Sequence, residues 1–394
     1  MVGLGELSLA HPTLARVLGL MGFVLCSSRL SGADGQPRGG KDGGTMAFGE
    51  ERCVVGAIRW DAWHGDKGVP GKAVEQSLGP SHWHYRLPFF GKVVSDGKVE
   101  ARGDSQAVMD QEIAYAHQAR LDYWAFVTYA PESPMSRGLD LYLSSAHKTD
   151  IRFCLILQGG HVVLNGPASW PGQVARYVGY FREKTYQTVA GGRPLVYLLE
   201  ARALVGRSGF ASWEAARAAF GDLRKTAVAA GLREPYLVVQ DGSAPRARNH
   251  MESLGFDAIS AYATTGGGEG KQPYSKLAEQ CRRFWDDCRA TGSAVVPIIM
   301  AGWDRRPRQE HPVPWERGEW TQSTLHYAAP TPAELASLLS DALKWVREYP
   351  QVAPAMAVLI YAWNELDEGG WIVPTLSEGA ARLDALKAVL AAGR

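Results

Sequence analysis

The chain has 394 residues, of which 46% are hydrophobic, and its 42 basic and 41 acidic residues leave a formal net charge of +1. This length and composition suffice for one large α/β barrel with long loops. The near-neutral charge, with no basic stripe and no acidic tail, argues against nucleic acid and anionic membranes as partners. The 13 tryptophans and 15 tyrosines, several of them in loops after expected strands, favour a carbohydrate ligand.

The first fifty residues divide into two segments. Residues 1–31 look like a signal peptide, because a short apolar run at 17–25 follows Arg16 and precedes small residues. That run is too short to span a bilayer. Residues 32–50 are Gly-rich and are predicted to form a linker. We therefore expect a secreted or periplasmic protein, or a cytoplasmic one if the true start is Met46.

From residue 51 onwards, expected strands and helices alternate eight times. The expected strands are short apolar runs at 54–60, 121–128, 151–157, 194–199, 236–240, 256–261, 294–300 and 357–361. The expected helices lie at 105–120, 136–149, 172–189, 212–230, 244–254, 274–290, 332–349 and 377–392. Asp104 is the expected N-cap of the first helix. Thr331 is that of the seventh, where proline takes the first helical position.

This alternation predicts a single (β/α)8 TIM barrel over residues 51–394, with long loops after strands one and seven. The strands read as continuous apolar runs, which is typical of parallel strands covered on both faces. The alternative is a doubly wound open sheet, which predicts a Gly-rich phosphate-binding turn after the first strand. The sequence there is Asp-Ala-Trp-His at 61–64, and the three glycines at 266–268 lack the Lys and Ser/Thr of a phosphate loop.

Functional side chains of such a barrel gather where the strands end at its C-terminal face. The residues near those ends form a ring of Trp, Tyr, His, Asp, Glu and Asn, which offer stacking faces and hydrogen bonds to sugar hydroxyls. The expected substrate-binding residues are Asp61, Trp63, His64, His84, Tyr129, Glu200, Asp241, Tyr262, Trp303, Asp304, Asn364 and Trp371. Each has a structural alternative, such as a pairing of Asp304 with Arg305 or Arg306.

The cysteines show no metal-binding spacing. His82 and His84 lie two residues apart, so that with His64 or Asp61 they offer a possible metal site. The favoured interpretation is an aromatic flap over the mouth of the barrel, in which these histidines bind sugar hydroxyls. We therefore expect neither a metal nor a cofactor.

The stretch 357–375 carries the strongest functional signal, because a buried strand runs directly into an acidic turn. Glu365 and Glu368 lie three residues apart and would share one face of a helical turn. Two carboxylates held close together have separated pKa values, so one can act as an acid and the other as a base. Trp363 and Trp371 offer flat apolar faces on either side. The alternative is a solvated acidic turn with tryptophans in the core.

Residues 362–374, Ala-Trp-Asn-Glu-Leu-Asp-Glu-Gly-Gly-Trp-Ile-Val-Pro, resemble the Trp-Asn-Glu-Trp-x-Glu-Gly signature of glycoside hydrolase family 99 and its WbsX-like relatives. Residues 111–129 and 301–306 are similar to two further segments of that group, in the same order. The resemblance implies a barrel that hydrolyses glycosidic bonds in an oligo- or polysaccharide.

The resemblance also implies a role for each glutamate. Glu365 would deprotonate the sugar 2-hydroxyl, which attacks the anomeric carbon. Glu368 would protonate the leaving oxygen and then activate water, so that configuration is retained. Tyr262 and Trp303 fall where such sites line the subsite of the reacting sugar.

Two residues depart from the family signature. Leu366 stands where the family has Trp, and Asp367 stands where His or Ala is usual. The ordinary two-carboxylate retaining and inverting schemes are therefore alternatives. Two other functions fit the residues: a WbsX-like glycosyltransferase-type role in surface polysaccharide synthesis, and a non-catalytic glycan-binding barrel.

Overall fold

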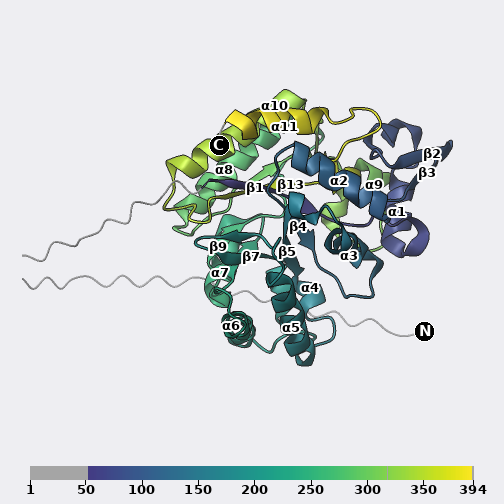
Figure 1. Cartoon of the computed structure of the whole chain (residues 1–394). Helices are drawn as coiled ribbons and strands as arrows, with labels where there is room; N and C mark the ends of the chain where they lie inside the picture. The colour runs from purple at the N-terminus through teal and green to yellow at the C-terminus, as the bar shows by residue number, and fades with distance from the viewer. Residues whose placement is uncertain (1–51, 317, 393–394) are drawn as a thin grey trace, which may run out of the picture. The chain divides into compact units, whose positions relative to one another are not determined.

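The computed structural model describes residues 52–316 and 318–392 (Figure 1). These residues belong to one compact unit. The predicted signal peptide and the predicted Gly-rich linker lie outside the described residues, as does the alternative start at Met46.

The centre of the described part is a barrel of eight parallel strands. They are β1 (Val54–Arg59), β4 (Tyr123–Val127), β5 (Arg152–Gln158), β7 (Arg193–Leu199), β8 (Tyr236–Gln240), β9 (Ala258–Ser260), β11 (Ile298–Met300) and β13 (Ala357–Tyr361). Their order in the sheet is β11-β13-β1-β4-β5-β7-β8-β9. A parallel bridge between Ile259 and Val295 brings the two ends of the sheet together. The predicted (β/α)8 barrel is therefore confirmed.

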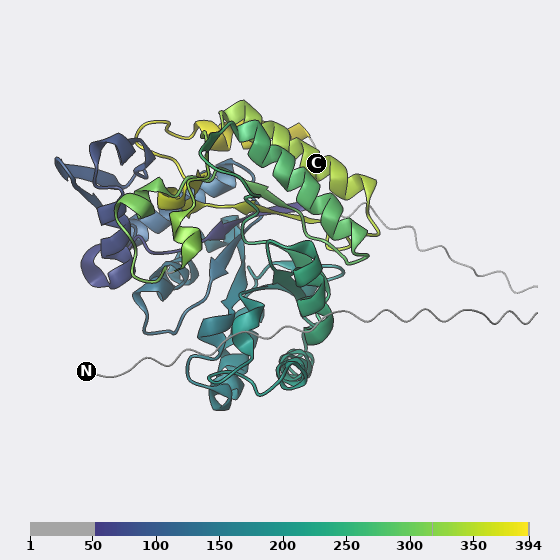
Figure 2. The ribbon, with the colours of Figure 1, turned by 180° about the vertical axis from the view of Figure 1, so that it is seen from behind.

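Helices surround the strands and connect each one to the next (Figures 1 and 2). The main helices are α2 (Gln106–Gln118), α3 (Arg137–Ser144), α5 (Trp170–Phe181), α6 (Trp213–Ala229), α7 (Ala244–Leu254), α8 (Tyr274–Ala290), α10 (Pro332–Glu348) and α11 (Ala381–Ala392). Helices α8, α10 and α11 lie together on one side of the barrel, and α5 and α6 lie on the opposite side. None of the helices in the described ranges has the length and apolar character that a membrane span requires.

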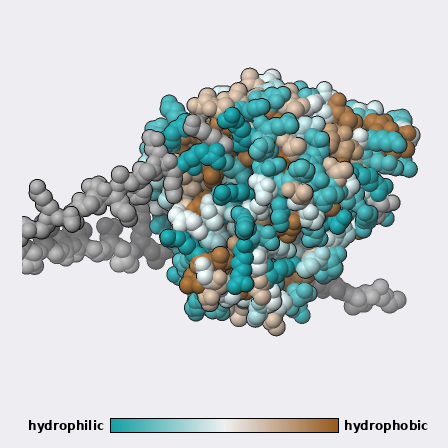
Figure 3. Space-filling model, viewed as in Figure 1, coloured by the Kyte–Doolittle hydropathy of each residue, from teal (hydrophilic) through white to brown (hydrophobic). Residues whose placement is uncertain are grey.

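The two long loops carry structure of their own. The loop after β1 contains α1 (Val69–Ser77) and a hairpin of β2 (Gly91–Ser95) and β3 (Lys98–Ala101). The loop after β11 contains α9 (Arg306–Glu310) and β12 (His326–Tyr327), which pairs with β10 (Lys271–Gln272). The short α4 (Gly159–Val162) follows β5. On the face shown in Figure 3, hydrophobic residues are scattered among hydrophilic ones.

Several elements differ from their predicted bounds, among them β11, α5 and α11. β11 begins at Ile298, because Pro297 has no N–H to donate to a neighbouring strand. The helix predicted over 172–189 ends at Phe181, and Thr188–Val189 forms the short β6, which pairs antiparallel with β7. The last helix begins at Ala381 rather than 377, because the hydroxyl of Ser377 donates to the Tyr85 carbonyl at 2.6 Å.

The helix caps follow the expected chemistry, with one correction. Thr331 caps α10: its hydroxyl accepts from the Glu334 N–H at 3.2 Å, and the Glu334 carboxylate accepts from the Thr331 N–H at 2.9 Å. Asp104 does not cap α2, because its carboxylate pairs with Lys67. Ser105 takes that place and accepts from the Val108 N–H at 3.3 Å.

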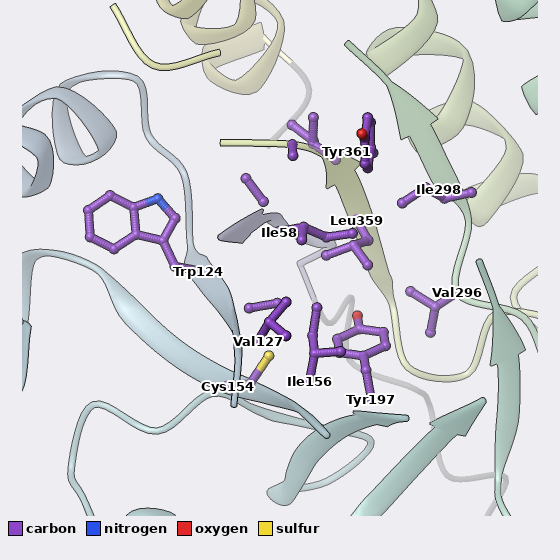
Figure 4. Close-up of a cluster of buried hydrophobic side chains, with 14 of the residues drawn as sticks. Ile58, Trp124, Val127, Cys154, Ile156, Tyr197, Val296, Ile298, Leu359 and Tyr361 are labelled. Carbon is purple, nitrogen blue, oxygen red and sulfur yellow. The ribbon is translucent and has the colours of Figure 1, made fainter. Parts of the chain in front are cut away.

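Side chains fill the inside of the barrel. Figure 4 shows branched and aromatic residues from several strands, among them Ile58, Ile156 and Leu359, packed into one buried cluster. The hydroxyls of Tyr123 and Tyr197 bond each other at 2.9 Å within this core. The barrel is therefore a packed core rather than a pore, and in barrels of this kind the functional residues gather at the C-terminal rim.

Candidate functional site

The chain turns sharply after β13 and carries its acidic residues in that turn. β14 (Asn364–Glu365) pairs antiparallel with β15 (Gly370–Trp371), and one 3-10 turn, Leu366–Glu368, joins them. Gly369 has a φ of 82°, in the left-handed region that favours glycine. A Cβ at this position would lie 2.5 Å from the backbone nitrogen of Asp304, so the turn after β13 fits tightly against the loop after β11.

Each glutamate of the turn accepts a hydrogen bond from a tyrosine. Tyr262, which follows β9, donates to Glu365 Oε1 at 2.5 Å. Tyr361, the last residue of β13, donates to Glu368 Oε2. The Trp303 ring centroid lies 5.8 Å from that of Tyr361. The structure thus brings together four of the predicted site residues, the two glutamates with Tyr262 and Trp303.

A single arginine joins the carboxylates. Arg308 Nη1 lies 2.5 Å from Glu368 Oε1, and its Nη2 lies 3.4 Å from Glu365 Oε2. Its Nε lies 2.7 Å from Asp367 Oδ2. Glu365 is 3% exposed, Glu368 is 8% exposed and Asp367 is fully buried. Arg308 therefore occupies the space directly beside the pair.

Residues 305–316, which we call the covering segment, supply the rest of this closure. Arg305 Nε lies 3.1 Å from Glu368 Oε1. Glu316 pairs with Arg305 and also with Arg308, the latter at 2.7 Å. The covering segment thus places two guanidinium groups and one carboxylate against the acidic turn, so that every one of these charges is compensated.

Two tryptophans hold Arg308 in place. Its guanidinium carbon lies 5.1 Å from the Trp60 ring centroid and 5.7 Å from that of Trp315. The two tryptophan centroids are 5.7 Å apart. Trp60 Nε1 also donates to the Tyr129 hydroxyl at 2.7 Å. Cation–π contacts therefore connect the covering segment to the loop after β1.

The environment separates the pKa values of the two glutamates. Burial, together with the charge of Glu368, raises the pKa of Glu365 well above its usual range. Burial acts in the same direction on Glu368, but Arg308, Arg305 and the hydrogen bond from Tyr361 outweigh it, so the pKa of Glu368 is lowered. At a given pH, Glu365 is therefore more fully protonated than Glu368. In this closed arrangement the order is opposite to the roles that the family resemblance implies.

Three further predicted residues hold the turn against β1. Asn364 Oδ1 accepts from the Trp60 N–H at 2.9 Å, and the Trp63 indole donates to the Asn364 carbonyl at 2.9 Å. Asp61 accepts from Asn364 Nδ2 at 3.4 Å and pairs with Arg59 at 2.8 Å. Burial outweighs Arg59 and raises the pKa of Asp61 to about 6. These side chains position the acidic turn rather than contact the glutamates.

Two predicted residues contact arginines instead of the glutamate pair. Asp304 pairs with Arg86, and with Arg306 at 2.8 Å, which is one of the structural alternatives stated for it. The guanidinium carbon of Arg382 lies 3.8 Å from the Trp371 ring centroid. Asp304 and Trp371 border a cavity of about 160 Å³.

Four predicted residues lie in local contacts of other rim loops. His64 is buried, and neither of its ring nitrogens has a partner among the described residues. The His84 Nε2 lies 2.8 Å from the Gly79 carbonyl oxygen. Glu200 accepts a hydrogen bond from the side-chain amide of Gln158 at 3.1 Å. Asp241 forms an ion pair with Arg246 at 2.7 Å, beside the start of α7. The remaining one, Tyr129, is linked to the glutamates through Trp60 and Arg308.

The histidines considered as metal ligands lie in separate contacts. The His82 Nε2 lies 2.9 Å from Glu310 Oε2, whereas His84 bonds backbone. Within residues 52–316 and 318–392, no three His, Cys, Asp or Glu side chains gather as a metal site requires. Of the cysteines, Cys154 is buried in β5 as a core residue, and Cys281 and Cys288 are buried free thiols in α8.

Sequence reasoning missed the groups that compensate the glutamates. Arg308, Glu316 and Tyr361 were not among the expected site residues. A usable signal was the run Arg-Arg-Pro-Arg at 305–308, which directly follows the Trp-Asp pair beyond strand seven. Such a density of positive charge at a strand end, beside an acidic turn on the neighbouring strand, indicates an ion-pair cluster across the barrel rim.

Comparison with known proteins gives a structural relationship only. No family model and no curated protein matches the chain. The structure is similar to that of the GH99 endo-α-mannosidase from Bacteroides thetaiotaomicron, with a TM-score of 0.53 and 13% identity over 86% of this chain and 95% of that one. A second structure of that enzyme, in complex with bis-tris-propane, gives a TM-score of 0.50 and 12% identity with the same coverage. This similarity establishes a shared barrel fold.

Proposed function

We propose that the protein is a glycoside hydrolase that cleaves a glycosidic bond in an oligo- or polysaccharide, with Glu365 and Glu368 as the catalytic pair. The observation that carries this proposal is the separated protonation of two adjacent buried glutamates, each bonded to a tyrosine, at the rim of the barrel. Glycoside hydrolysis requires such an acid and base on either side of the scissile bond. The fold shared with an endo-α-mannosidase supports this choice.

The covering segment must move before a sugar can reach the pair. Arg308 contacts both carboxylates, and Trp315 packs over Arg308. When the arginines withdraw, Glu368 loses the two cations that hold its pKa low, whereas its burial effect persists if a sugar replaces them. Its pKa then rises, and Glu368 becomes able to donate a proton.

This change connects the closed structure with the mechanism that the resemblance implies. In the open state the proton of the pair passes from Glu365 to Glu368. Glu368 then protonates the leaving oxygen, and the Glu365 carboxylate accepts the proton of the sugar 2-hydroxyl, which attacks the anomeric carbon. Glu368 then removes a proton from the water that opens the cyclic intermediate, and Glu365 returns its proton to the 2-oxygen of the sugar. Two inversions leave the configuration retained.

The test is product release from a panel of α- and β-linked oligosaccharides by the wild type, Glu365→Gln and Glu368→Gln. Because general acid–base catalysis contributes on the order of 10²- to 10⁴-fold, each variant is expected to lose activity by that factor. Glu252→Gln, which changes an exposed carboxylate of α7, is the matched control and should keep wild-type activity. Proton NMR of the first product anomer reports retention or inversion.

A second candidate is a glycan-binding barrel without catalysis. The observation that favours it is the burial of both glutamates in a compensated ion cluster, as in a purely structural network. In that case no glycan of the panel is cleaved, yet a glycan binds, and Glu365→Gln and Glu368→Gln leave its affinity unchanged. That pattern would overturn the hydrolase proposal.

A further inference from the structure

A second cavity lies on the same rim, next to Tyr129. It has a volume of about 210 Å³ and is lined by the loop after β4, the loop after β5 and the first turns of α5. A monosaccharide-sized group fits a space of this order. Tyr129 connects it with the glutamate pair, because its hydroxyl accepts from Trp60, whose ring contacts Arg308.

Among the residues that line this cavity, Arg176 is the one arginine, and none is an aspartate, a glutamate or a lysine. Among the described residues, half-buried Arg176 makes no salt bridge, and its Nε has no hydrogen-bond partner. Its Nη1 donates to the Tyr129 carbonyl at 3.1 Å, which fixes the guanidinium at the cavity wall. Buried arginines elsewhere in the barrel all have carboxylate partners, namely Arg59, Arg86, Arg305, Arg308 and Arg382.

The other walls have the chemistry of a sugar site. His161 lines the cavity, its Nδ1 has no partner among the described residues, and its ring lies edge-on to Tyr129 at 4.7 Å. Burial lowers the pKa of His161, so the imidazole is neutral and Arg176 supplies the charge. Leu164, which is 62% exposed, offers an apolar surface, and the side-chain amide of Asn165 offers donors and acceptors for hydroxyls.

We propose that this cavity is a glycan subsite that takes a uronic acid residue, with Arg176 binding its carboxylate, so that the substrate is an acidic glycan. The proposal deepens the glycoside hydrolase function and rests on it. A guanidinium without a carboxylate partner, bonded to a backbone carbonyl at the wall of a cavity, is complementary to a planar ligand carboxylate. Its connection through Tyr129 and Trp60 places the acidic residue away from the glutamate pair, as a neighbour of the sugar that reacts.

The test is calorimetric titration of the full chain with oligogalacturonate and oligoglucuronate, each compared with its carboxyl-reduced counterpart. Arg176→Gln removes the charge and keeps a donor for the Tyr129 carbonyl. Arg182→Gln, at the exposed end of the same helix, is the matched control. Loss of one charge-assisted hydrogen bond should weaken uronate binding by about tenfold or more. The reduced glycans should bind equally to all three proteins.

Equal binding of a uronate glycan and its reduced form by the wild type, or equal uronate binding by Arg176→Gln and wild type, would overturn the subsite. Arg176→Lys separates charge from packing, because it keeps the cation and should retain part of the preference. These outcomes are independent of cleavage. If the glutamate variants lose hydrolysis but Arg176→Gln binds uronate as well as the wild type, the hydrolase proposal stands and the subsite proposal fails. If the protein prefers uronate glycans but cleaves none, the subsite proposal stands and the protein is a glycan-binding barrel.

Discussion

At the scale of single residues, the two glutamates differ in what compensates them. Glu365 is close to neutral Tyr262 and only distantly bonded by Arg308 at 3.4 Å, whereas Glu368 has Arg308 at 2.5 Å and Arg305 at 3.1 Å. One carboxyl is therefore held as an acid and the other as an anion. Both residues are glutamates in the same turn. Replacing each in turn by glutamine therefore separates the effect of a raised pKa on stability from that of a lowered pKa.

We expect Glu365→Gln to unfold at or above the wild-type temperature near neutral pH. The pKa of Glu365 is raised in the folded state, so the wild type loses stability as pH rises above about 4.3, the value of an unperturbed Glu. Glutamine does not ionise and avoids this loss. Thermal melts across pH should therefore show the variant and the wild type converging below about pH 4. A variant that is markedly less stable at neutral pH would contradict a protonated Glu365.

Glu368→Gln should behave in the opposite way. The pKa of Glu368 is lowered in the folded state, so its carboxylate contributes stability above its unfolded pKa, and this contribution is lost as pH falls through the folded value. Removing it leaves Arg305 and Arg308 undercompensated, which costs about 3–5 kcal/mol near neutral pH. The same thermal melts should show this deficit shrinking in acid. Equal stability changes for the two glutamine variants would refute the assignment.

Arg308 is the residue on which the closed cluster depends. We expect Arg308→Met to destabilise the fold by about 3–5 kcal/mol, because three buried carboxyl groups lose a shared cation. Arg306→Met is the matched control, since its side chain is 43% exposed and its partner Asp304 keeps Arg86. The control should cost less than about 1 kcal/mol. Urea unfolding compares the two, and similar losses would show that the cluster is not tightly coupled.

The sequence could indicate the glutamate pair but not Arg308. Glu365 and Glu368 are readable because their spacing and the strand before them are local. Arg308 acts on carboxylates 57 to 60 positions away, and a loop carries no periodic pattern to reveal such a contact. Asp304 was predicted to bind substrate because it lies at a strand end. Its carboxylate instead forms ion pairs with Arg86 and Arg306, which the local sequence pattern does not reveal.

At the scale of elements, the site depends on the fit between the loops after β11 and β13. Gly302 has a φ of 140°, and a Cβ there would lie 2.1 Å from the carbonyl oxygen of Gly369. Two glycines thus let the backbone before the covering segment touch the turn that holds Glu368. Without this approach, Arg305 and Arg308 would be displaced from the carboxylates.

We expect Gly302→Ala to cost about 2–3 kcal/mol, because the added methyl group forces the two loops apart against a disfavoured φ. Gly221→Ala, within α6, is the matched control, since a Cβ there meets no atom within 4 Å. Alanine is the better helix former, so the control should gain about 0.5–1 kcal/mol. Differential scanning calorimetry separates these opposite signs. A neutral Gly302→Ala would show that the loops do not need this contact.

The elements themselves were largely predictable. The bounds of β8, β13, α7 and α8 agree with the sequence pattern, because each is a clean run of apolar or amphipathic residues. The prediction failed where two neighbouring residues were equally suited to one role and a tertiary contact decided which of them fills it. Asp104 and Ser105 are both good caps, and the ion pair with Lys67 decides between them.

At the scale of the whole molecule, the alternation of eight strands and helices was enough to indicate the barrel. It could not indicate whether the rim is open or closed, because closure depends on contacts between distant loops. In the structure, the covering segment joins the loop after β1 to the turn after β13 through Trp315 and Trp60. If the protein is the hydrolase proposed above, it must exist in closed and open states, and the closed fraction would lower its apparent affinity for glycan.

Trp315→Ala should shift this equilibrium towards the open state. Trp315 is 39% exposed and contributes little to the barrel core, so the overall stability should change little, whereas Arg308 loses one of its two aromatic contacts. Hydrogen exchange measured by mass spectrometry should therefore speed up over residues 305–316 and stay at the wild-type rate in the barrel strands. Trp213→Ala, which removes a tryptophan stacked 5.2 Å from His250 at the start of α6, is the matched control and should leave exchange in the covering segment unchanged.

The same variant distinguishes a cover from a sugar-stacking surface. If Trp315 only holds the segment closed, its removal raises the binding-competent fraction, and the KM for a cleaved glycan falls. If instead its ring stacks on the sugar, KM rises while exchange over residues 305–316 changes as before. Unchanged exchange would contradict the role of Trp315 in closure altogether. Trp315 contacts Arg308, and Arg308 is the arginine that contacts Glu365 among the described residues. This single position therefore reports whether the loop after β11 controls access to the glutamate pair.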